Sequence, residues 1–256
     1  MQSLNRKSGI IAITEGKPKY LKNKLFSSEF YLDAYNLLVN NNFDDNSCRG
    51  TLLYVIKWLN ASLLPLPCDF QEHVFVEIQR KCSDQNMIAG NVYCSPNSSC
   101  DNDLKLRDII SYIYNKFRGH KQIDGDFNYG NIDWKSWAGG NDETKFLSCL
   151  RNNFLLQHVT ETTWFRASDE PHILDLILTD ENFISDLEYL RPVGKSDHVV
   201  LSFDCELGIT SCNNSFKFNF IKGDYDQLRL FMDRNWKKEF EPLGDNVNDV
   251  WNYCLF

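Results

Sequence analysis

Acidic, amide and histidine residues recur along the chain at the ends of apolar segments that have the character of strands. The set comprises Glu15, Asp126, Asn128, Asp175, Asp197 and His198. Hydrolysis of a phosphodiester at neutral pH needs a divalent cation to offset charge, a base to activate water and donors that steady the leaving oxygen. Carboxylates and an amide suit Mg²⁺, and a histidine held by a carboxylate suits the base or phosphate-stabilising role. These residue types therefore indicate metal-dependent phosphoester chemistry.

Each of these residues also has a plain structural interpretation. Glu15 at a strand end is more often a solvated side chain, and His198 alone is more often a structural histidine. Asp175 lies inside HILDLIL, where a carboxylate is costly unless it is paired or bound to a cation, so a structural salt bridge is its alternative role. Tyr93 alone would be an ordinary core or surface aromatic residue. The functional interpretation depends on finding these residues in one arrangement.

The hydrophobic patterns predict the elements that would position these side chains. Short apolar or alternating runs predict strands at 10–14, 51–59, 73–79, 87–93, 121–126, 172–180 and 198–207. Apolar residues at helical spacing predict an amphipathic helix over 103–117 and a second helix carrying Phe146, Leu147, Leu150 and Phe154. The irregular alternation favours two packed sheets with outer helices over a regular parallel α/β fold.

The bulk composition narrows the class of protein. The chain has 256 residues, a size that suits one large domain with a short appendage, and no stretch approaches the length of apolar chain that a membrane span needs. Its nine cysteines include no CxxC pair, so we expect free thiols in a reducing compartment and no zinc site. The formal net charge of −8 opposes binding of a polyanion, although a hard-cation site itself requires several carboxylates.

The ordered motifs resemble the endonuclease/exonuclease/phosphatase superfamily, which has the DNase I-like fold. The matching segments are ITE ending at Glu15, VYCSPNS with Tyr93, GDFN at 125–128, LDLIL with Asp175, and SDH at 196–198. The resemblance implies an α/β (α+β) fold, a four-layer αββα sandwich of two mixed sheets with outer helices. It covers residues 1–207, and we expect 208–256 to be a linker and the start of a connector. Within 208–256 the pattern predicts a short strand at 215–220, a helix carrying Leu228, Phe231 and Met232, and a helical piece at 247–256.

A closer resemblance is to the endonuclease domain of non-LTR (LINE-type) retrotransposons. It is carried by IIAITEGKPK, RGTLLYV, GDFNYGNIDW, FLSCLRNNFLLQHV and KSDHVVLSFD. The C-terminal FNFIKGDYDQLRLFM and WKKEF resemble the connector that precedes the reverse transcriptase in such elements. The resemblance implies DNA as partner, a covalently linked reverse transcriptase in a full-length element, and intracellular action, in the nucleus on DNA.

The resemblance also implies a role for each matching catalytic residue. Tyr93 would contact the scissile phosphate or help to orient the site, and Asp126 would activate the attacking water. Asn128 would steady the transition state. Asp175 would orient His198, which would act on the phosphate.

The resemblance also implies which residues would bind a metal ion. Glu15 and Asp197 would be ligands of Mg²⁺, with Mn²⁺ as a possible substitute, and Asp197 would otherwise support His198. Superfamily members begin with an Asn-bearing strand and a helix, whereas only a few residues precede Ile10 here. We therefore expect this chain to lack the first strand, the first helix and the Asn ligand. Asp124 also occupies a strand position that is normally apolar.

Three functions follow for comparison. The first is a Mg²⁺-dependent DNA endonuclease that nicks target DNA for a retrotransposon. The second is a phosphatase or lipid phosphodiesterase of the same superfamily, which the acidic net charge of −8 favours. The third is a catalytically dead retroelement remnant that keeps the fold, which the expected loss of the first strand favours.

Overall fold

The computed structural model describes residues 7–17, 27–40, 49–67, 69–79, 85–166, 169–207, 225–235, 238 and 241. The chain divides into two compact units, Met1–Ser211 and Cys212–Phe256. In the second unit, helix α3 (Tyr225–Met232) is present where a helix carrying Leu228, Phe231 and Met232 was predicted. The short strand predicted at 215–220 and the helical piece predicted at 247–256 lie outside the described residues.

A six-stranded mixed sheet forms the centre of the first unit. Its strands, in spatial order, are β4 (Asn60–Leu63), β5 (His73–Gln79), β6 (Met87–Tyr93), β7 (His120–Asp126), β9 (Asp175–Thr179) and β8 (Leu156–Gln157). Strands β6 and β7 run parallel, and the other neighbouring pairs are antiparallel. The parallel pair requires a crossover, which helix α1 (Cys100–Lys116) supplies.

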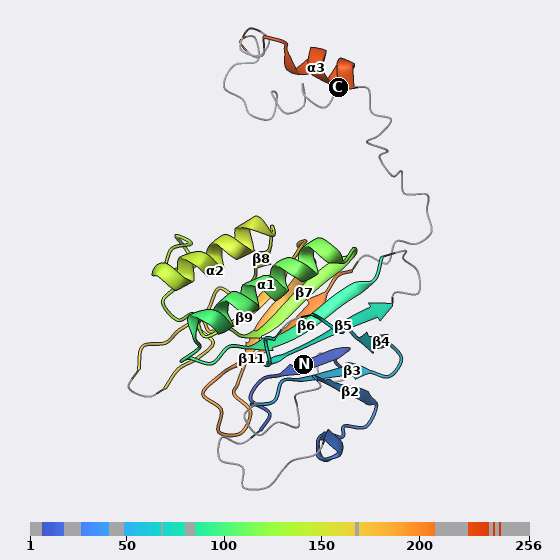
Figure 1. Cartoon of the computed structure of the whole chain (residues 1–256), viewed down its shortest axis with the longest axis vertical. Coiled ribbons are helices and arrows are strands. Elements are labelled where there is room, and N and C mark those ends of the chain that lie inside the picture. The colour runs from blue at the N-terminus through green and yellow to red at the C-terminus, as the bar shows by residue number, and fades with distance from the viewer. Residues whose placement is uncertain are drawn as a thin grey trace. The chain divides into compact units, whose positions relative to one another are not determined.

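Helices α1 and α2 (Asn141–Asn152) cover one face of this sheet, as Figure 1 shows. Helix α1 begins three residues earlier than the predicted Asp103, because the Ser99 hydroxyl accepts a hydrogen bond from the Asn102 N–H at 3.2 Å and caps it. The predicted second helix ends before Phe154, whose side chain is 72% exposed. The helices and the sheet enclose a core of buried aliphatic and aromatic side chains.

A second sheet packs on the other face. It has three antiparallel strands in the order β1 (Ile10–Ile13), β3 (Leu52–Ile56) and β2 (Tyr35–Val39). Leu53 and Val55 of β3 pack against Val74 and Val76 of β5, which forms a second core between the sheets. A 3₁₀ helix, η1 (Ser27–Phe30), contacts β2, and the Phe30 carbonyl accepts a hydrogen bond from the Tyr54 hydroxyl.

A two-stranded hairpin completes the first unit. Strand β10 (Ile184–Leu190) pairs with β11 (Val200–Cys205) in antiparallel register, with an irregularity between Ser185 and Glu188. The loop that joins the two strands carries the SDH motif. The hairpin therefore places that motif at the start of β11.

The predicted fold class is confirmed: the chain is an α/β protein of packed sheets with outer helices. The strands predicted at 73–79 and 87–93 have those bounds in the structure. Strands β2, β4, β8 and β10 were not predicted. Among the described residues, no helix combines the length and apolar character that a membrane crossing requires.

Candidate active site

The first part of the candidate site lies at the end of strand β7. Gly125 has a φ of +141°, and a Cβ there would lie 1.9 Å from the Val92 carbonyl oxygen, so only glycine fits against β6 at this position. Asp126 follows as the last residue of the strand and is 4% exposed. The Asn128 backbone N–H donates to Asp126 Oδ1 at 3.2 Å, and its side-chain amide donates to the Cys94 carbonyl at 2.8 Å. The GDFN turn thus fixes the Asp126 carboxylate.

Asp175 and His198 form the second part of the site. Asp175 is the first residue of β9 and pairs directly with Asp126 of β7. Its Oδ2 lies 2.7 Å from Nδ1 of His198, and both side chains are largely buried. This bond orients the imidazole and favours a proton on Nδ1.

Thr163 holds Asp175 and the segment that carries His198 in place. It is fully buried, and its hydroxyl oxygen accepts the backbone N–H groups of Leu174 and Asp175, each at 3.0 Å. Its carbonyl accepts the N–H of Val199 at 2.8 Å. One residue therefore ties the start of β9 to the segment that carries His198.

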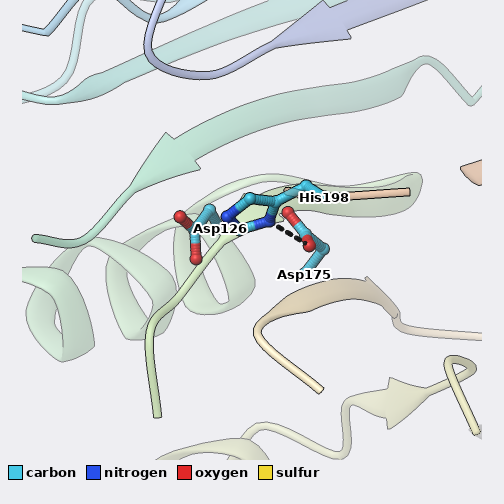
Figure 2. A group of neighbouring side chains, drawn as sticks. All are labelled: Asp126, Asp175 and His198. Atoms are coloured by element: carbon cyan, nitrogen blue, oxygen red, sulfur yellow. Dashed lines mark hydrogen bonds and ion pairs between the residues drawn. The ribbon is translucent and has the colours of Figure 1, made fainter. Parts of the chain in front are cut away.

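Asp126, Asp175 and His198 form one compact group, the candidate catalytic cluster, hereafter called the catalytic cluster. One ligand atom from each lies within 4.8 Å of the others. Figure 2 shows the imidazole between the two carboxylates, with its hydrogen bond to Asp175. Three segments distant in sequence therefore converge at one end of the central sheet.

Burial and like charge perturb the acid–base properties of the cluster. Burial, and next the nearby Asp175 carboxylate, hold the pKa of Asp126 far above its usual range. Burial by itself lowers the pKa of His198, but the hydrogen bond and charge of Asp175 outweigh it and raise that pKa to about 9. At neutral pH the imidazole is therefore expected to be protonated, with Nε2 available as a donor.

Glu15 and Tyr93 meet beside this cluster. The Tyr93 hydroxyl donates to Glu15 Oε1 at 2.6 Å, and the Arg49 guanidinium pairs with the same oxygen at 3.1 Å. Burial and then this hydrogen bond raise the pKa of the Tyr93 phenol, which stays neutral. Tyr93 also lies opposite Asp126 in the β6–β7 register. This arrangement joins the end of β1 to the end of β6.

Asp197 is held at the rim by Arg166. The guanidinium of Arg166 donates to Asp197 Oδ2 at 2.9 Å, and Arg166 also stacks over the Trp164 ring. Burial opposes ionisation of Asp197, but hydrogen bonds from its own backbone and from Trp164 and Arg166 outweigh it and lower its pKa. Asp197 is therefore an ionised carboxylate at the entrance.

The predicted site residues fall into three groups in the structure. Asp126, Asp175 and His198 form the catalytic cluster, and Tyr93 with Glu15 adjoins it. Glu15 and Asp197, the two predicted metal ligands, are outside the three-residue group, although both line the same groove as the cluster. Asn128 uses its side-chain amide to hold the turn through Cys94.

Sequence reasoning missed three residues that organise the site. Arg49 belongs to the RGTLLYV segment, next to Gly50, where no local pattern marks it as a site residue. Thr163 and Arg166 lie in TTWFR, which carries no recognisable pattern. Only the tertiary structure places them on Glu15, Asp175 and Asp197.

The cluster fits a hard divalent cation. Two buried carboxylates face one another across a strand pair, and their mutual repulsion disfavours the doubly ionised form. A cation that binds carboxylate oxygens relieves this repulsion, and Mg²⁺ prefers such ligands. Asp126, the adjoining Glu15 and Asp197 offer carboxylate oxygens along the same groove, and this donor set is chemically suited to it.

The fold is DNase I-like, and the residue types gathered at the candidate site suit phosphoester hydrolysis. Residues 87–202 match a family model described as endonuclease–reverse transcriptase. Over this segment the chain is similar to the endonuclease/exonuclease/phosphatase superfamily, a group of hydrolases. A search of curated proteins found no match.

Solved structures share the fold at low sequence identity. The endonuclease domain of TRAS1, a telomere-specific non-LTR retrotransposon, is 13% identical, with a TM-score of 0.59, over 77% of this chain and 85% of that one. The AP endonuclease LMAP from Leishmania major is also 13% identical, with a TM-score of 0.55, over 75% of this chain and 76% of that one. These likenesses establish the DNase I-like architecture.

Proposed function

We propose that this chain is a Mg²⁺-dependent DNA endonuclease domain of a retrotransposon-derived protein. The observation that carries the proposal is the buried catalytic cluster, in which Asp175 holds His198 beside Asp126. The family model, described as endonuclease–reverse transcriptase, supports the retroelement origin. The TRAS1 domain is an endonuclease of a non-LTR retrotransposon, which supports DNA as the substrate class.

His198 acts on the phosphate in this proposal. Because Asp175 accepts the Nδ1 proton and raises the pKa of His198 to about 9, the ring is cationic near neutral pH. Its Nε2–H can then donate to a phosphoryl oxygen and offset charge that develops in the transition state. Asp175 is accordingly a positioning residue for His198.

Asp126 is the proposed general base. Its raised pKa brings its basicity closer to neutrality, where a carboxylate accepts a proton from water more effectively. The backbone N–H of Asn128 donates to Oδ1, so that oxygen is held while Oδ2 remains to accept. Tyr93, a neutral phenol beside Glu15, is proposed to orient the phosphate.

Glu15 and Asp197 are the proposed cation ligands, and Asp126 offers a further carboxylate oxygen. Bound Mg²⁺ would offset charge on the phosphoryl oxygens, and Mn²⁺ uses the same oxygen ligands. Arg49 and Arg166, which pair with Glu15 and Asp197, would hold these two carboxylates in place. The proposal includes a linked reverse transcriptase in the complete element and action in the nucleus.

A plasmid-nicking assay tests this proposal. Supercoiled plasmid is incubated with the protein in Mg²⁺ or in EDTA, and open-circular product is measured. We expect nicking only with Mg²⁺, and a loss of about 10²- to 10⁴-fold in His198→Ala, since that variant lacks the phosphate donor. The matched control is His120→Ala, because His120 starts the strand that Asp126 ends and pairs with Glu181.

Three results would remove the endonuclease assignment. Equal nicking by the wild type and His198→Ala would show that the cluster does not act on DNA. Hydrolysis of p-nitrophenyl phosphate without any nicking would instead favour a phosphatase, the candidate that the net charge of −8 supports. Absence of both activities in a folded, Mg²⁺-loaded protein would leave the non-catalytic remnant.

A further inference from the structure

Residues 160–166 form a short segment, hereafter the strap, that lies against the catalytic cluster. The backbone N–H of Thr163 donates to the carbonyl of His172 at 2.9 Å. The backbone N–H of Phe165 donates to the carbonyl of Asp197 at 3.1 Å. The strap is therefore hydrogen-bonded both to the segment that leads into β9 and to the SDH motif.

The start of the strap is anchored by Tyr189 of strand β10. The phenol oxygen accepts the backbone N–H groups of Thr160 at 2.8 Å and of Glu161 at 3.2 Å. A hydroxyl oxygen has two lone pairs, so one side chain can satisfy two adjacent donors. Side chains alternate along β10, where Asp186 and Glu188 are exposed and Tyr189 is partly buried. The strand therefore turns this ring away from solvent and onto the strap.

The middle of the strap reaches the catalytic cluster through Thr163. Its hydroxyl oxygen accepts the backbone N–H of Asp175 at 3.0 Å, and its carbonyl accepts the N–H of Val199 at 2.8 Å. Asp175 Oδ2 in turn lies 2.7 Å from Nδ1 of His198. A continuous path of hydrogen bonds and main chain thus runs from the Tyr189 phenol to the imidazole.

The hydrogen bond between Asp175 and His198 joins two different sheets. Asp175 begins β9 in the six-stranded sheet, whereas His198 precedes β11 in the hairpin. The strap lies between these segments, and Trp164 makes an isolated bridge to His172 on one side and to His198 on the other. Functional groups need to be held within about 0.5 Å of their working geometry. A strap that is loose at its start would let the two side chains separate.

We propose that Tyr189 is a positioning residue for the catalytic cluster. Its phenol oxygen fixes the start of the strap, and the strap fixes Asp175 relative to His198. The hydrogen bond between these two side chains then sets the direction of Nε2. The consequence for phosphate chemistry rests on the proposed function, whereas the hydrogen bond itself forms without DNA or a cation. The β10–β11 hairpin thereby has a second role beside carrying the SDH motif.

Proton NMR of His198 tests this proposal directly. Protein with ¹⁵N-labelled histidine is studied in EDTA, and the Nδ1–H resonance is identified by its loss in His198→Ala. Tyr189→Phe keeps the ring and removes the acceptor. We expect the Nδ1 proton to exchange with water about two- to tenfold faster in this variant, the range that one hydrogen bond of ordinary strength supports. The amides of Thr160 and Glu161 should lose protection by a similar factor.

Plasmid nicking in Mg²⁺ shows whether the same contact matters for catalysis. We expect the rate at saturating DNA to fall by about two- to tenfold in Tyr189→Phe. The double variant with Thr163→Val should be no slower than Thr163→Val alone. Both substitutions act on the bond between Asp175 and His198, and effects within one hydrogen-bond network are not additive.

The matched control is Tyr54→Phe. The Tyr54 hydroxyl donates to the Phe30 carbonyl at 2.7 Å in the second sheet, so this variant also loses a hydroxyl bond to the main chain. Because neither residue belongs to the strap, the His198 resonance and the nicking rate should match those of the wild type. An equal effect of Tyr54→Phe and Tyr189→Phe would reflect a general loss of stability and would overturn the proposal.

The remaining outcomes separate the positioning role from the proposed function. Unchanged proton exchange at His198 in Tyr189→Phe would overturn the positioning role, as would additive losses of nicking in the double variant. A wild type that does not nick DNA but has a Tyr189-dependent His198 resonance would support the positioning role and remove the endonuclease assignment. Absence of a hydrogen-bonded Nδ1–H resonance in the wild type would overturn both.

Discussion

The two faces of the six-stranded sheet are built from alternate residues of the same strands, yet they differ in kind. The face under α1 and α2 is mainly apolar, with Ile88, Val92, Ile123, Leu176 and Leu178 in one core. The opposite face carries, at neighbouring positions, Asn91, Gln122, Asp124, Asp126 and Asp175. Since side chains of a strand alternate between faces, a single run of sequence specifies both surfaces.

The two faces therefore contribute differently to the stability of the fold and to its function. The apolar face gains free energy from burial, whereas the polar face holds buried carboxylates that oppose folding unless they are neutralised. Burial raises the pKa of Asp124 to about 7, and the Gln122 amide offsets part of that rise. We infer that the helix-covered face stabilises the sheet strongly enough to maintain the polar face for chemistry and binding.

The largest expected effect is on the apolar face. Phe146 is fully buried and stacks on Tyr129 with ring centroids 4.3 Å apart, so Phe146→Ala should lower the free energy of unfolding by about 3–5 kcal/mol. Phe154 is 72% exposed, and Phe154→Ala should change it by less than about 0.5 kcal/mol. Urea denaturation measures both. Equal destabilisation by the two variants would show that the core under α1 and α2 does not supply the stability assigned to it.

A smaller loss of stability is expected from substitution of Thr163, which holds Asp175 on the polar face. Thr163→Val keeps the shape but leaves the buried N–H groups of Leu174 and Asp175 without their acceptor, at a cost of about 2–4 kcal/mol. Because this brace positions Asp175, nicking should also fall, whereas Thr163→Ser should retain both stability and activity. Unchanged nicking in a destabilised Thr163→Val protein would show that the brace serves the fold alone.

A smaller effect, whose sign can be predicted, is expected in the way the free energy of unfolding depends on pH. The pKa of His198 is raised from 6.5 to about 9, so its contribution is fully present below pH 6.5 and is lost as pH rises through 9. The pKa of Asp126 is also raised, which acts in the same direction. Unfolding by urea in EDTA should therefore require less denaturant at pH 9 than at pH 6.5. His198→Ala should flatten this trend, and an increase in stability over that range would contradict the charge assignment.

The smallest effect is expected at the rim. Arg166 pairs with Asp197 at 2.9 Å, but its side chain is 67% exposed, so Arg166→Ala should alter the free energy of unfolding by less than about 1 kcal/mol. Its effect on the Mg²⁺ dependence of nicking should be larger, since Arg166 holds a proposed ligand. A thermal melt and a Mg²⁺ titration distinguish the two effects, and a large loss of stability would place Arg166 among structural residues.

Local pattern sufficed for the central elements of the fold. Strands β5 and β6 were predicted with their observed bounds, because alternation and β-branching over seven residues are strong local signals. Strand β2 (YNLLV) and β10 (ISDLEYL) were missed. Their sequences are short or contain acidic residues, and only pairing with β3 and β11 makes them strands.

The site was predictable where ordered motifs marked it and unpredictable where contacts built it. GDFN, LDLIL and SDH pointed to Asp126, Asp175 and His198, which the structure brings together. No pattern in sequence could show that Thr163 braces Asp175 or that Arg49 holds Glu15, since both contacts join distant segments.

Asp124 and Asp126 provide the most direct test of the central claim. Both carboxylates lie on the same face of β7, where Asp126 is buried and Asp124 is partly buried, and only Asp126 belongs to the catalytic cluster. Plasmid nicking in Mg²⁺ is measured for the wild type, Asp126→Asn and Asp124→Asn, each checked by circular dichroism. We expect a loss of about 10³-fold or more in Asp126→Asn and wild-type nicking in Asp124→Asn. Wild-type nicking in Asp126→Asn would contradict it.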